Sequence, residues 1–296
     1  MPAITWIQQM LAFYAHLTER DLHILALLDE HRVLTTDQIT RLHFTAARTC
    51  QIRLRELQHL GLIERFRYAR AGGGGDPWHW TLGVLGARFM AGTLGRPIPT
   101  ERAHREQLLR LSAYVNLRHL RQANEFGVRL AVRARSDPQA RLLRWWSERT
   151  ATTRFRGIHP DAHGLWQSSG RLVGWFLECD MGTESQPRLV AKLLAYDNLA
   201  RTDGPTYPVL FWLPGSVREA NLHRALRRHW PPVPVATATH DADPAGPVWL
   251  TVGARKRVPL AELPSDHGRA VAGNPNWVDG ELDLSPPDSP GHGDLS

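Results

Sequence analysis

The sequence predicts a two-domain α+β protein, in which a small helical domain carrying a β-hairpin is followed by a mixed sheet flanked by helices. Two observations support this prediction. Between residues 18 and 95, helical periodicity gives way to two short alternating segments around a run of four glycines. Between residues 101 and 263, the expected order is helix, three strands, helix and strand, which is typical of a sheet covered by helices. At 296 residues, the chain is long enough for two hydrophobic cores.

The first domain, residues 18–95, is expected to begin with three short helices. Thr18 can cap the first, and Thr35 or Thr36 can cap the second, which ends at His43. Thr45 can cap the third, over residues 46–60, before the stop at Gly61. Helical spacing gives the third helix a buried stripe of Cys50, Leu54, Leu57 and Leu60, and an exposed face of Arg48, Gln51, Ile52 and Arg55.

A hairpin and a closing helix complete this domain. Residues 62–68 and 78–82 alternate as strands around the glycine loop 72–75, and residues 84–92 form the closing helix. The order helix, turn, helix and hairpin predicts a winged helix-turn-helix, which lays its second helix in the DNA major groove. The junction RLREL-x-x-LGLIER also resembles that of many winged-helix proteins. We expect DNA contacts from Arg48, Gln51 and Arg55, and phosphate contacts from the wing residues Arg65, Arg67 and Arg70.

The charge distribution agrees with a nucleic-acid partner. The chain carries 36 Lys and Arg against 29 Asp and Glu, a net charge of +7. Residues 1–230 are net positive and residues 231–296 net negative, so the basic charge lies where a phosphate-binding surface is expected. All basic residues except Lys192 and Lys256 are arginine, and this bias reflects GC-rich coding as much as phosphate binding. The expected partner is double-stranded DNA.

Composition excludes several other classes of protein. The two cysteines, Cys50 and Cys179, lie inside apolar runs, so neither a disulfide framework nor a zinc cluster is indicated. No apolar run is as long as a membrane span. The first 18 residues carry no Lys or Arg, unlike a secretory signal. We therefore expect no membrane partner and a cytoplasmic location.

The second domain, residues 101–263, is expected to follow a linker at residues 96–100. Its first elements are a helix over residues 104–124, a strand over 128–133, and a segment over 139–149 that fits either a helix end or a strand. Later elements are strands over 157–166 and 172–180, a helix over 187–201, a strand over 207–213, a helix over 217–230, and short strands over 233–239 and 248–252. Residues 1–17 are expected to form an N-terminal arm. Residues 264–296 are expected to be a disordered acidic tail whose removal leaves thermal stability unchanged.

Acidic side chains mark the candidate chemistry of the second domain. Asp161 lies in HPDAHG at the start of one strand, and Glu178 and Asp180 lie in FLECDMGTES at the end of the next. Their i, i+2 spacing puts Glu178 and Asp180 on one face of the strand. Carboxylates at the end of so apolar a strand are explained by a bound Mg²⁺, or by a strand that emerges into solvent beside a basic residue. His159 and His163 alternate with Asp161 and are weaker candidates for metal ligands.

These features resemble the PD-(D/E)xK nuclease superfamily. The resemblance rests on Pro160-Asp161, the hairpin, the pair Glu178 and Asp180, and a following helix that contains Lys192. It implies that Asp161, Glu178 and Asp180 hold the metal, and that Lys192 steadies the attacking water or the phosphate. Asp180 stands where the family has its lysine, so the resemblance leaves catalysis open. Glu106 matches an additional acid that some members carry.

The whole stretch from Thr18 to Trp230 resembles the replication-relaxation family. The motifs that carry this resemblance are HPD, LECDMGTES and KLLAYD. It implies a protein of a plasmid or integrative element that acts in DNA relaxation, replication or conjugative transfer, with a relaxase or replication protein as a candidate partner. Three interpretations follow: a DNA-binding accessory factor, a Mg²⁺-dependent endonuclease or nickase targeted by its winged helix, and a transcriptional regulator. A homodimer remains open in each of them.

Overall fold

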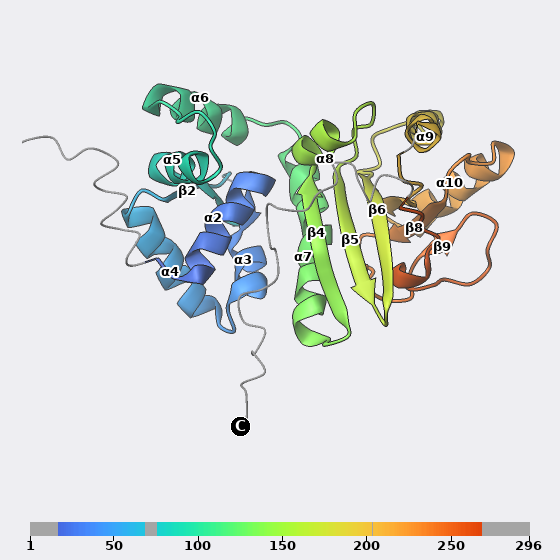
Figure 1. Ribbon diagram of the computed structural model, residues 1–296, viewed down its shortest axis with the longest axis horizontal. Helices are drawn as coiled ribbons and strands as arrows, with labels where there is room; N and C mark the ends of the chain where they lie inside the picture. Colours follow the sequence, from blue (N-terminus) through green and yellow to red (C-terminus); the bar gives the residue numbers. More distant parts are fainter. Residues whose placement is uncertain (1–16, 69–75, 203, 268–296) are drawn as a thin grey trace, which may run out of the picture. The chain divides into compact units, whose positions relative to one another are not determined.

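The computed structural model describes residues 17–68, 76–202 and 204–267 (Figure 1). They form two compact units that divide between Arg121 and Gln122, inside helix α7 (Leu117–Ser136). The predicted linker, residues 96–100, has no regular structure. The helix that follows it, α6 (Glu101–Ser112), nevertheless belongs to the N-terminal unit and contacts α5 there. The division therefore falls about twenty residues after the predicted linker. The predicted arm lies outside the described residues, apart from Leu17.

The N-terminal unit has the predicted order of helices and strands. Its three antiparallel strands lie in the order β1-β3-β2. The elements are α2 (Glu19–His31), β1 (Leu34–Thr35), α3 (Thr36–His43), α4 (Ala47–His59), β2 (Ile63–Phe66), β3 (His79–Leu82), α5 (Val84–Thr93) and α6. The short strand β1 was not predicted, and the glycine loop 72–75 lies outside the described residues.

Two of the three predicted helix caps are found. Thr18 caps α2 in a capping box with Asp21, and Thr35 caps α3 in the same way with Gln38. The prediction for Thr45 is wrong, because α4 is capped by Ala46 and has no side-chain cap hydrogen bond. Packing holds α4 instead, through its fully buried residues Cys50, Leu54 and Leu57. Gly61 has φ +70°, as expected for the residue that stops this helix.

The C-terminal unit is a six-stranded mixed sheet in the order β4-β5-β6-β7-β8-β9. Strands β4, β5 and β6 are antiparallel neighbours, β6, β7 and β8 are parallel, and β9 is antiparallel to β8. After α7 come β4 (Ala140–Ser147), α8 (Glu148–Arg154), β5 (Ala162–Ser168), β6 (Arg171–Cys179), α9 (Gln186–Arg201), β7 (Val209–Leu213), α10 (Ser216–Arg228), β8 (Val235–Thr239), β9 (Leu250–Thr251) and a 3₁₀ turn (Leu260–Glu262). The expected order of helix, three strands, helix and strand is found in α7, β4–β6, α9 and β7. The first strand, however, is β4, in the segment 139–149 that fits either a helix end or a strand by sequence, and α8 lies between β4 and β5.

Helices cover both faces of this sheet. On one face, Phe126 of α7 packs edge-on against Trp175 and Trp212, at ring-centroid distances of 5.1 and 5.0 Å. On the other face, α9 and α10 bury their apolar stripes in a single core with strands β5 to β8; these stripes are Leu189, Leu193, Tyr196, Leu222 and Leu226. A residue of β6 or β7 therefore faces α7 or the α9–α10 layer according to its position in the alternation.

Two expectations for the first part of this domain are wrong. The predicted helix 104–124 is two helices, α6 and α7, separated by residues 113–116. The predicted strand 128–133 is part of α7. Val128 and Leu130 alternate as in a strand, but the buried set also includes Ala123, Phe126 and Ala131, and this larger set follows the helical period.

The predicted boundary of the tail is also wrong by a few residues. The backbone of Asp266 pairs with that of Thr206 through hydrogen bonds of 2.8 and 3.1 Å. Ser265 Oγ accepts a hydrogen bond from the Gly174 N–H at 3.0 Å, and His267 contacts the Tyr207 hydroxyl at 2.8 Å. Residues 265–267 therefore pack on the C-terminal unit. The rest of the predicted tail, from residue 268, lies outside the described residues.

Candidate functional site

The outer face of α4 presents the three predicted DNA-contacting side chains to solvent. Arg48, Gln51 and Arg55 are exposed, and Ile52 beside them has 44% of its surface accessible. Within the described part of the chain, neither Arg48 nor Arg55 has a carboxylate partner. The opposite face of α4 is buried in the N-terminal unit. These two guanidinium groups therefore remain available to an anion from outside the unit.

Arg53, on the same helix, shows what a structural arginine looks like in this unit. Its Nη2 contacts Asp21 Oδ2 at 2.5 Å, and its Nη1 contacts Glu56 Oε2 at 2.7 Å. The Asp21 side chain is fully buried. Burial raises the pKa of Asp21, but hydrogen bonds from Arg53 and Thr18 outweigh burial and bring that pKa below its ordinary value. Arg53 thus ties α4 to α2 and is not available to bind DNA.

Two of the three predicted wing residues, Arg65 and Arg67, lie on one face of the β2–β3 hairpin. The guanidinium carbon of Arg65 lies 4.1 Å from the Trp78 ring centroid, and that of Arg67 lies 4.4 Å from it. Arg65 also lies 5.4 Å from the Trp80 ring centroid. The indole N–H of Trp80 donates to Thr36 Oγ1 at 2.9 Å, which joins the hairpin to the start of α3. Arg70 lies outside the described residues.

In the C-terminal unit, strands β5 and β6 bring Asp161 and Glu178 to the same end of the sheet. Ala162 pairs with Leu177, so Asp161 stands beside Glu178 at the next position of the antiparallel ladder. The Asp161 N–H donates to the Leu177 carbonyl at 2.9 Å, and the Cys179 N–H donates to Asp161 Oδ2 at 2.7 Å. These backbone bonds fix the Asp161 carboxylate. The predicted convergence of Asp161 and Glu178 is found.

Glu178 is buried and receives two hydrogen bonds from α9. Lys192 Nζ donates to its Oε2 at 2.7 Å, and the Tyr196 hydroxyl donates to its Oε1 at 2.5 Å. Burial and the neighbouring Asp161 carboxylate raise the pKa of Glu178 to about 7, although Lys192 and Tyr196 oppose this shift. Burial lowers the pKa of Lys192, but Glu178 outweighs burial and raises that pKa above its ordinary value. Lys192 is therefore a cation that pairs with the Glu178 carboxylate.

Asp180 belongs to a different set of contacts. Its Oδ2 accepts from Arg218 Nε at 2.5 Å, and its Oδ1 accepts from the Gly182 N–H at 2.9 Å. Lys192 divides its charge between Glu178 and Glu184, whose Oε2 lies 3.2 Å from Nζ. Lys192 thus pairs with Glu178, the carboxylate next to Asp161, and Arg218 of α10 pairs with Asp180.

The residues at this end of the sheet fit a divalent cation only in part. Within the described residues, no group of three or more His, Cys, Asp or Glu is positioned to hold a metal ion. Asp161 and Glu178 are adjacent oxygen donors. The pKa of Glu178 is raised first by burial and second by the Asp161 carboxylate, and a cation would offset the repulsion between the two carboxylates. Both oxygens of Asp180 are engaged by Arg218 and Gly182. Both oxygens of Glu178 accept hydrogen bonds from Lys192 and Tyr196, so a cation held by Asp161 and Glu178 would share the Glu178 carboxylate with these two groups.

The weaker sequence candidates lie elsewhere. His163 is completely buried, and its Nδ1 contacts the Trp175 carbonyl at 2.8 Å, which makes it a core residue. Glu106 forms an exposed ion pair with Arg102 on α6, in the N-terminal unit. Sequence reasoning missed two participants, Tyr196 and Arg218. Tyr196 follows Lys192 by one helical turn, a spacing that the sequence shows, whereas Arg218 lies 38 residues from Asp180 and is recognisable only in the fold.

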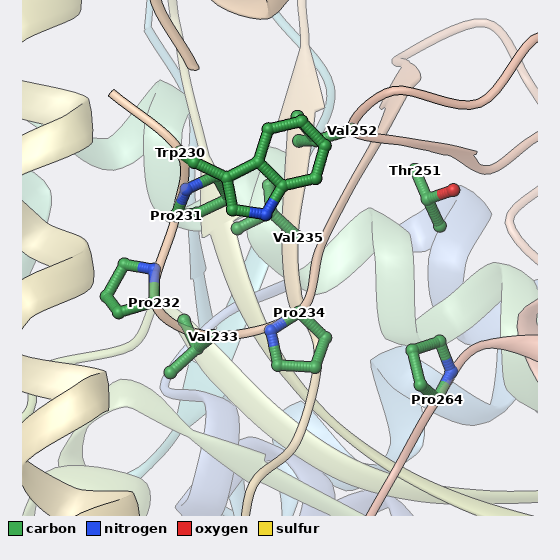
Figure 2. Close-up of a pocket in the computed structure, with 9 residues that line it drawn as sticks. All are labelled: Trp230, Pro231, Pro232, Val233, Pro234, Val235, Thr251, Val252 and Pro264. Carbon is green, nitrogen blue, oxygen red and sulfur yellow. The ribbon is translucent and has the colours of Figure 1, made fainter. Parts of the chain in front are cut away.

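Two cavities of the C-terminal unit lie away from Asp161, Glu178 and Asp180. One, of about 330 Å³, is lined by Trp230, Val252 and the proline-rich segment 231–235, and Figure 2 shows the Trp230 indole standing over it. Another, of about 530 Å³, is lined by the start of β6 and residues 263–266. Both are open hollows, so neither provides an enclosed site at Asp161 and Glu178. No described helix has the length and apolar composition needed to cross a bilayer.

Comparison with known proteins identifies the family. The model of the replication-relaxation family matches residues 25–209, which is more than half of the chain. The chain therefore belongs to the replication-relaxation family, in agreement with the resemblance carried by its motifs. Membership indicates a role in the replication or relaxation of mobile elements. No curated protein matches, and no solved structure matches.

Proposed function

We propose that this replication-relaxation protein is a DNA-binding accessory factor of a mobile element, and that the N-terminal unit binds duplex DNA through α4 and the wing. The observation that carries this proposal is the exposed α4 face, where Arg48 and Arg55 lack carboxylate partners within the described residues. The following hairpin adds Arg65 and Arg67. Helix, turn, helix and wing in this order are the winged helix-turn-helix arrangement, whose second helix reads base edges.

The family assignment supports this proposal, because replication or relaxation of an element requires a protein to find the element's DNA. Arginine in the major groove contacts guanine bidentately, and glutamine contacts adenine in the same way. Arg48, Gln51 and Arg55 would supply such contacts. Backbone contacts from the wing would add affinity that does not depend on sequence. A relaxase or replication protein would then act on the DNA that the accessory factor marks.

Replacement of the two exposed arginines tests this proposal. Binding of the full chain to duplex fragments of its own element should weaken strongly in Arg48→Ala/Arg55→Ala, by about 1–3 kcal/mol for each arginine that reads a base. Fluorescence anisotropy at several salt concentrations would measure it. The variant should melt like the wild type, because surface substitutions of this kind change stability by no more than about 0.5 kcal/mol.

Two comparisons make the result decisive. Arg41→Ala is a matched control, because Arg41 is a partly exposed helical arginine already paired with Asp37 at 2.8 Å, and it should bind DNA as the wild type does. Footprinting on two DNA fragments, one with the element's transfer or replication origin and one with the gene's own promoter, separates the two functions. An accessory factor should protect the origin, and a transcriptional regulator should protect the promoter. Unchanged affinity in a folded Arg48→Ala/Arg55→Ala protein would refute DNA binding by α4.

A second candidate function, a Mg²⁺-dependent endonuclease or nickase, is favoured by the convergence of Asp161, Glu178 and Lys192. Asp161 and Glu178 would hold the cation, which when bound polarises a phosphodiester and activates a water. Lys192, held as a cation beside Glu178, would contact a phosphate oxygen and would not act as a base. Tyr196 orients the Glu178 carboxylate. The order of α7, β4–β6, α9 and β7 supports the resemblance to PD-(D/E)xK nucleases.

Metal titration and a nicking assay test this second function. Calorimetry with Mg²⁺ or Mn²⁺ should detect binding to the wild type and none to Asp161→Asn, which keeps the shape of the side chain but removes its charge. Supercoiled plasmid carrying the element's origin should be nicked by the wild type alone. Metal binding without nicking would refute the nuclease function and leave the accessory function as the proposal. Equal, negligible metal binding in both proteins would refute the metal site.

A further inference from the structure

The wing contains a ladder of alternating guanidinium and indole groups, formed by Arg67, Trp78, Arg65 and Trp80. Arg65 pairs with Trp80 in the β2–β3 register, and Trp78 stands two residues before Trp80, so all four side chains share one face of the hairpin. Trp78 lies within 4.4 Å of both guanidinium carbons. Trp80 is buried, which anchors the ladder in the N-terminal unit.

The ladder holds two positive charges close together, and no carboxylate among the described residues pairs with them. Within the described residues, neither Arg65 nor Arg67 forms a salt bridge. Arg53 and Arg96 of the same unit, by contrast, are paired with Asp21 and Asp29. Like charges held side by side repel, and an anion placed between them relieves that repulsion.

The guanidinium carbons of Arg65 and Arg67 lie over the Trp78 ring, 4.1 and 4.4 Å from its centroid. A guanidinium that lies over an aromatic ring uses its flat face for the contact, while its N–H donors point outward in its own plane. These donors form a fork that matches two oxygens of a phosphate. Stacking on Trp78 also restricts two long side chains that would otherwise lose conformational freedom on binding.

We propose that Trp78 is a positioning residue that orients Arg65 and Arg67 for bidentate contacts with successive phosphates of duplex DNA. This inference rests on the proposed DNA-binding function and adds to it the group that arranges the wing. Trp78 itself makes no contact with the DNA, since its stacking partners are the two arginines. Its effect on affinity comes from holding the donors in place before DNA arrives.

Salt titration of Trp78→Leu separates positioning from contact. Loss of the stacking contacts should weaken duplex binding about tenfold, because two long arginine side chains would then lose their conformational freedom only when DNA binds. The slope of log affinity against log salt should stay at its wild-type value, because both arginines still reach phosphate. Arg65→Ala/Arg67→Ala should lower that slope by about two, roughly one for each lost phosphate contact.

Three further variants complete the experiment. Trp78→Phe keeps an aromatic face and should recover most of the affinity. Arg67→Lys keeps the charge without the planar fork and should weaken binding at an unchanged slope. Trp230→Leu replaces another tryptophan, 68% exposed in the C-terminal unit, and should bind as the wild type does.

The possible failures are distinguishable. A wild-type chain that does not bind duplex DNA would refute the proposed function itself. If the wild type binds DNA and Trp78→Leu binds equally well, only the positioning role of Trp78 is refuted. A salt slope in Trp78→Leu as low as that of Arg65→Ala/Arg67→Ala would also overturn it, because Trp78 would then maintain the fold of the wing.

Discussion

Two regions of the molecule, one in each unit, use charged side chains in opposite ways. On α4 and the wing, Arg48, Arg55, Arg65 and Arg67 lack carboxylate partners within the described residues, and they lie on surfaces rather than in the core. At the end of the C-terminal sheet, Glu178 and Asp180 are buried, with 2% and 4% of their surfaces exposed, and each has a basic partner from a helix. The four arginines therefore have no counter-charge among the described residues, whereas Glu178 and Asp180 are paired with Lys192 and Arg218.

This difference predicts different consequences of removing a charge. An exposed arginine loses little solvation on folding, so its replacement affects binding and not stability. A buried carboxylate depends on its partner, and removing that partner leaves an uncompensated charge in the core. The substitutions that lower stability and those that lower DNA affinity should therefore fall at different residues of the chain.

The largest effect on stability is expected for Arg218→Met. Arg218 Nε lies 2.5 Å from Asp180 Oδ2, and the side chains are 18% and 1% exposed. Removing the guanidinium leaves Asp180 buried and unpaired, which should cost about 3–5 kcal/mol of unfolding free energy. Guanidinium chloride unfolding, followed by tryptophan fluorescence, measures this loss.

Two controls accompany this measurement. Arg55→Met makes the same change on the exposed face of α4 and should leave the unfolding free energy within about 0.5 kcal/mol of wild type. Asp180→Asn combined with Arg218→Met removes both charges and should recover part of the loss, since an unpaired charge is no longer buried. Equal stabilities of Arg218→Met and Arg55→Met would contradict the contrast between the units.

The sequence was sufficient to predict elements whose pattern is local. Thr18 and Thr35 precede apolar stripes and are found as caps, and the helix expected at 187–201 is α9. The hairpin that joins Asp161 to Glu178 was predictable because Ser169 and Gly170 form its turn, with φ values of 50° and 76°. That turn fixes the register, and the register fixes the distance between the two acids.

Elements that depend on distant partners were not predictable. Val128 and Leu130 alternate as in a strand, and only the packing of α7 on the tryptophans of the sheet makes the segment helical. The pairing of Lys192 with Glu178, and of Arg218 with Asp180, depends on how α9 and α10 lie on the sheet. No local spacing distinguishes this arrangement from a pairing of Lys192 with Asp180.

The next largest effect is a pH dependence of stability caused by Glu178. Its pKa is about 7 in the folded chain, against 4.5 for an ordinary glutamate. Between these two values the folded state keeps a proton that the unfolded state has released. Stability from this group is therefore greatest at and below about pH 4.5 and falls as pH rises to about 7, by a total on the order of 2–3 kcal/mol.

Differences between variants isolate this contribution. Glu178→Gln cannot titrate, so the unfolding free energy of wild type minus that of Glu178→Gln should fall by roughly 2 kcal/mol between pH 4.5 and 7.5. Asp161→Asn removes a neighbouring charge that raises the Glu178 pKa, so its stability should fall less over the same range. A constant difference between wild type and Glu178→Gln would show that Glu178 titrates normally.

The smallest effect concerns where the C-terminal unit ends. Removing residues 268–296 keeps Ser265, Asp266 and His267, whereas removing residues 264–296 deletes them together with their hydrogen bonds to Gly174, Thr206 and Tyr207. The Tyr207 ring is buried, so its hydroxyl would lose a partner at the edge of the core. The longer deletion should therefore be less stable than the shorter one by about 1–2 kcal/mol. Calorimetry should show this as a melting temperature lower by roughly 2–8 °C. Identical melting temperatures would place the end of the folded unit before Pro264, as the sequence predicts. The contacts of residues 265–267 would then make no contribution to the unfolding free energy.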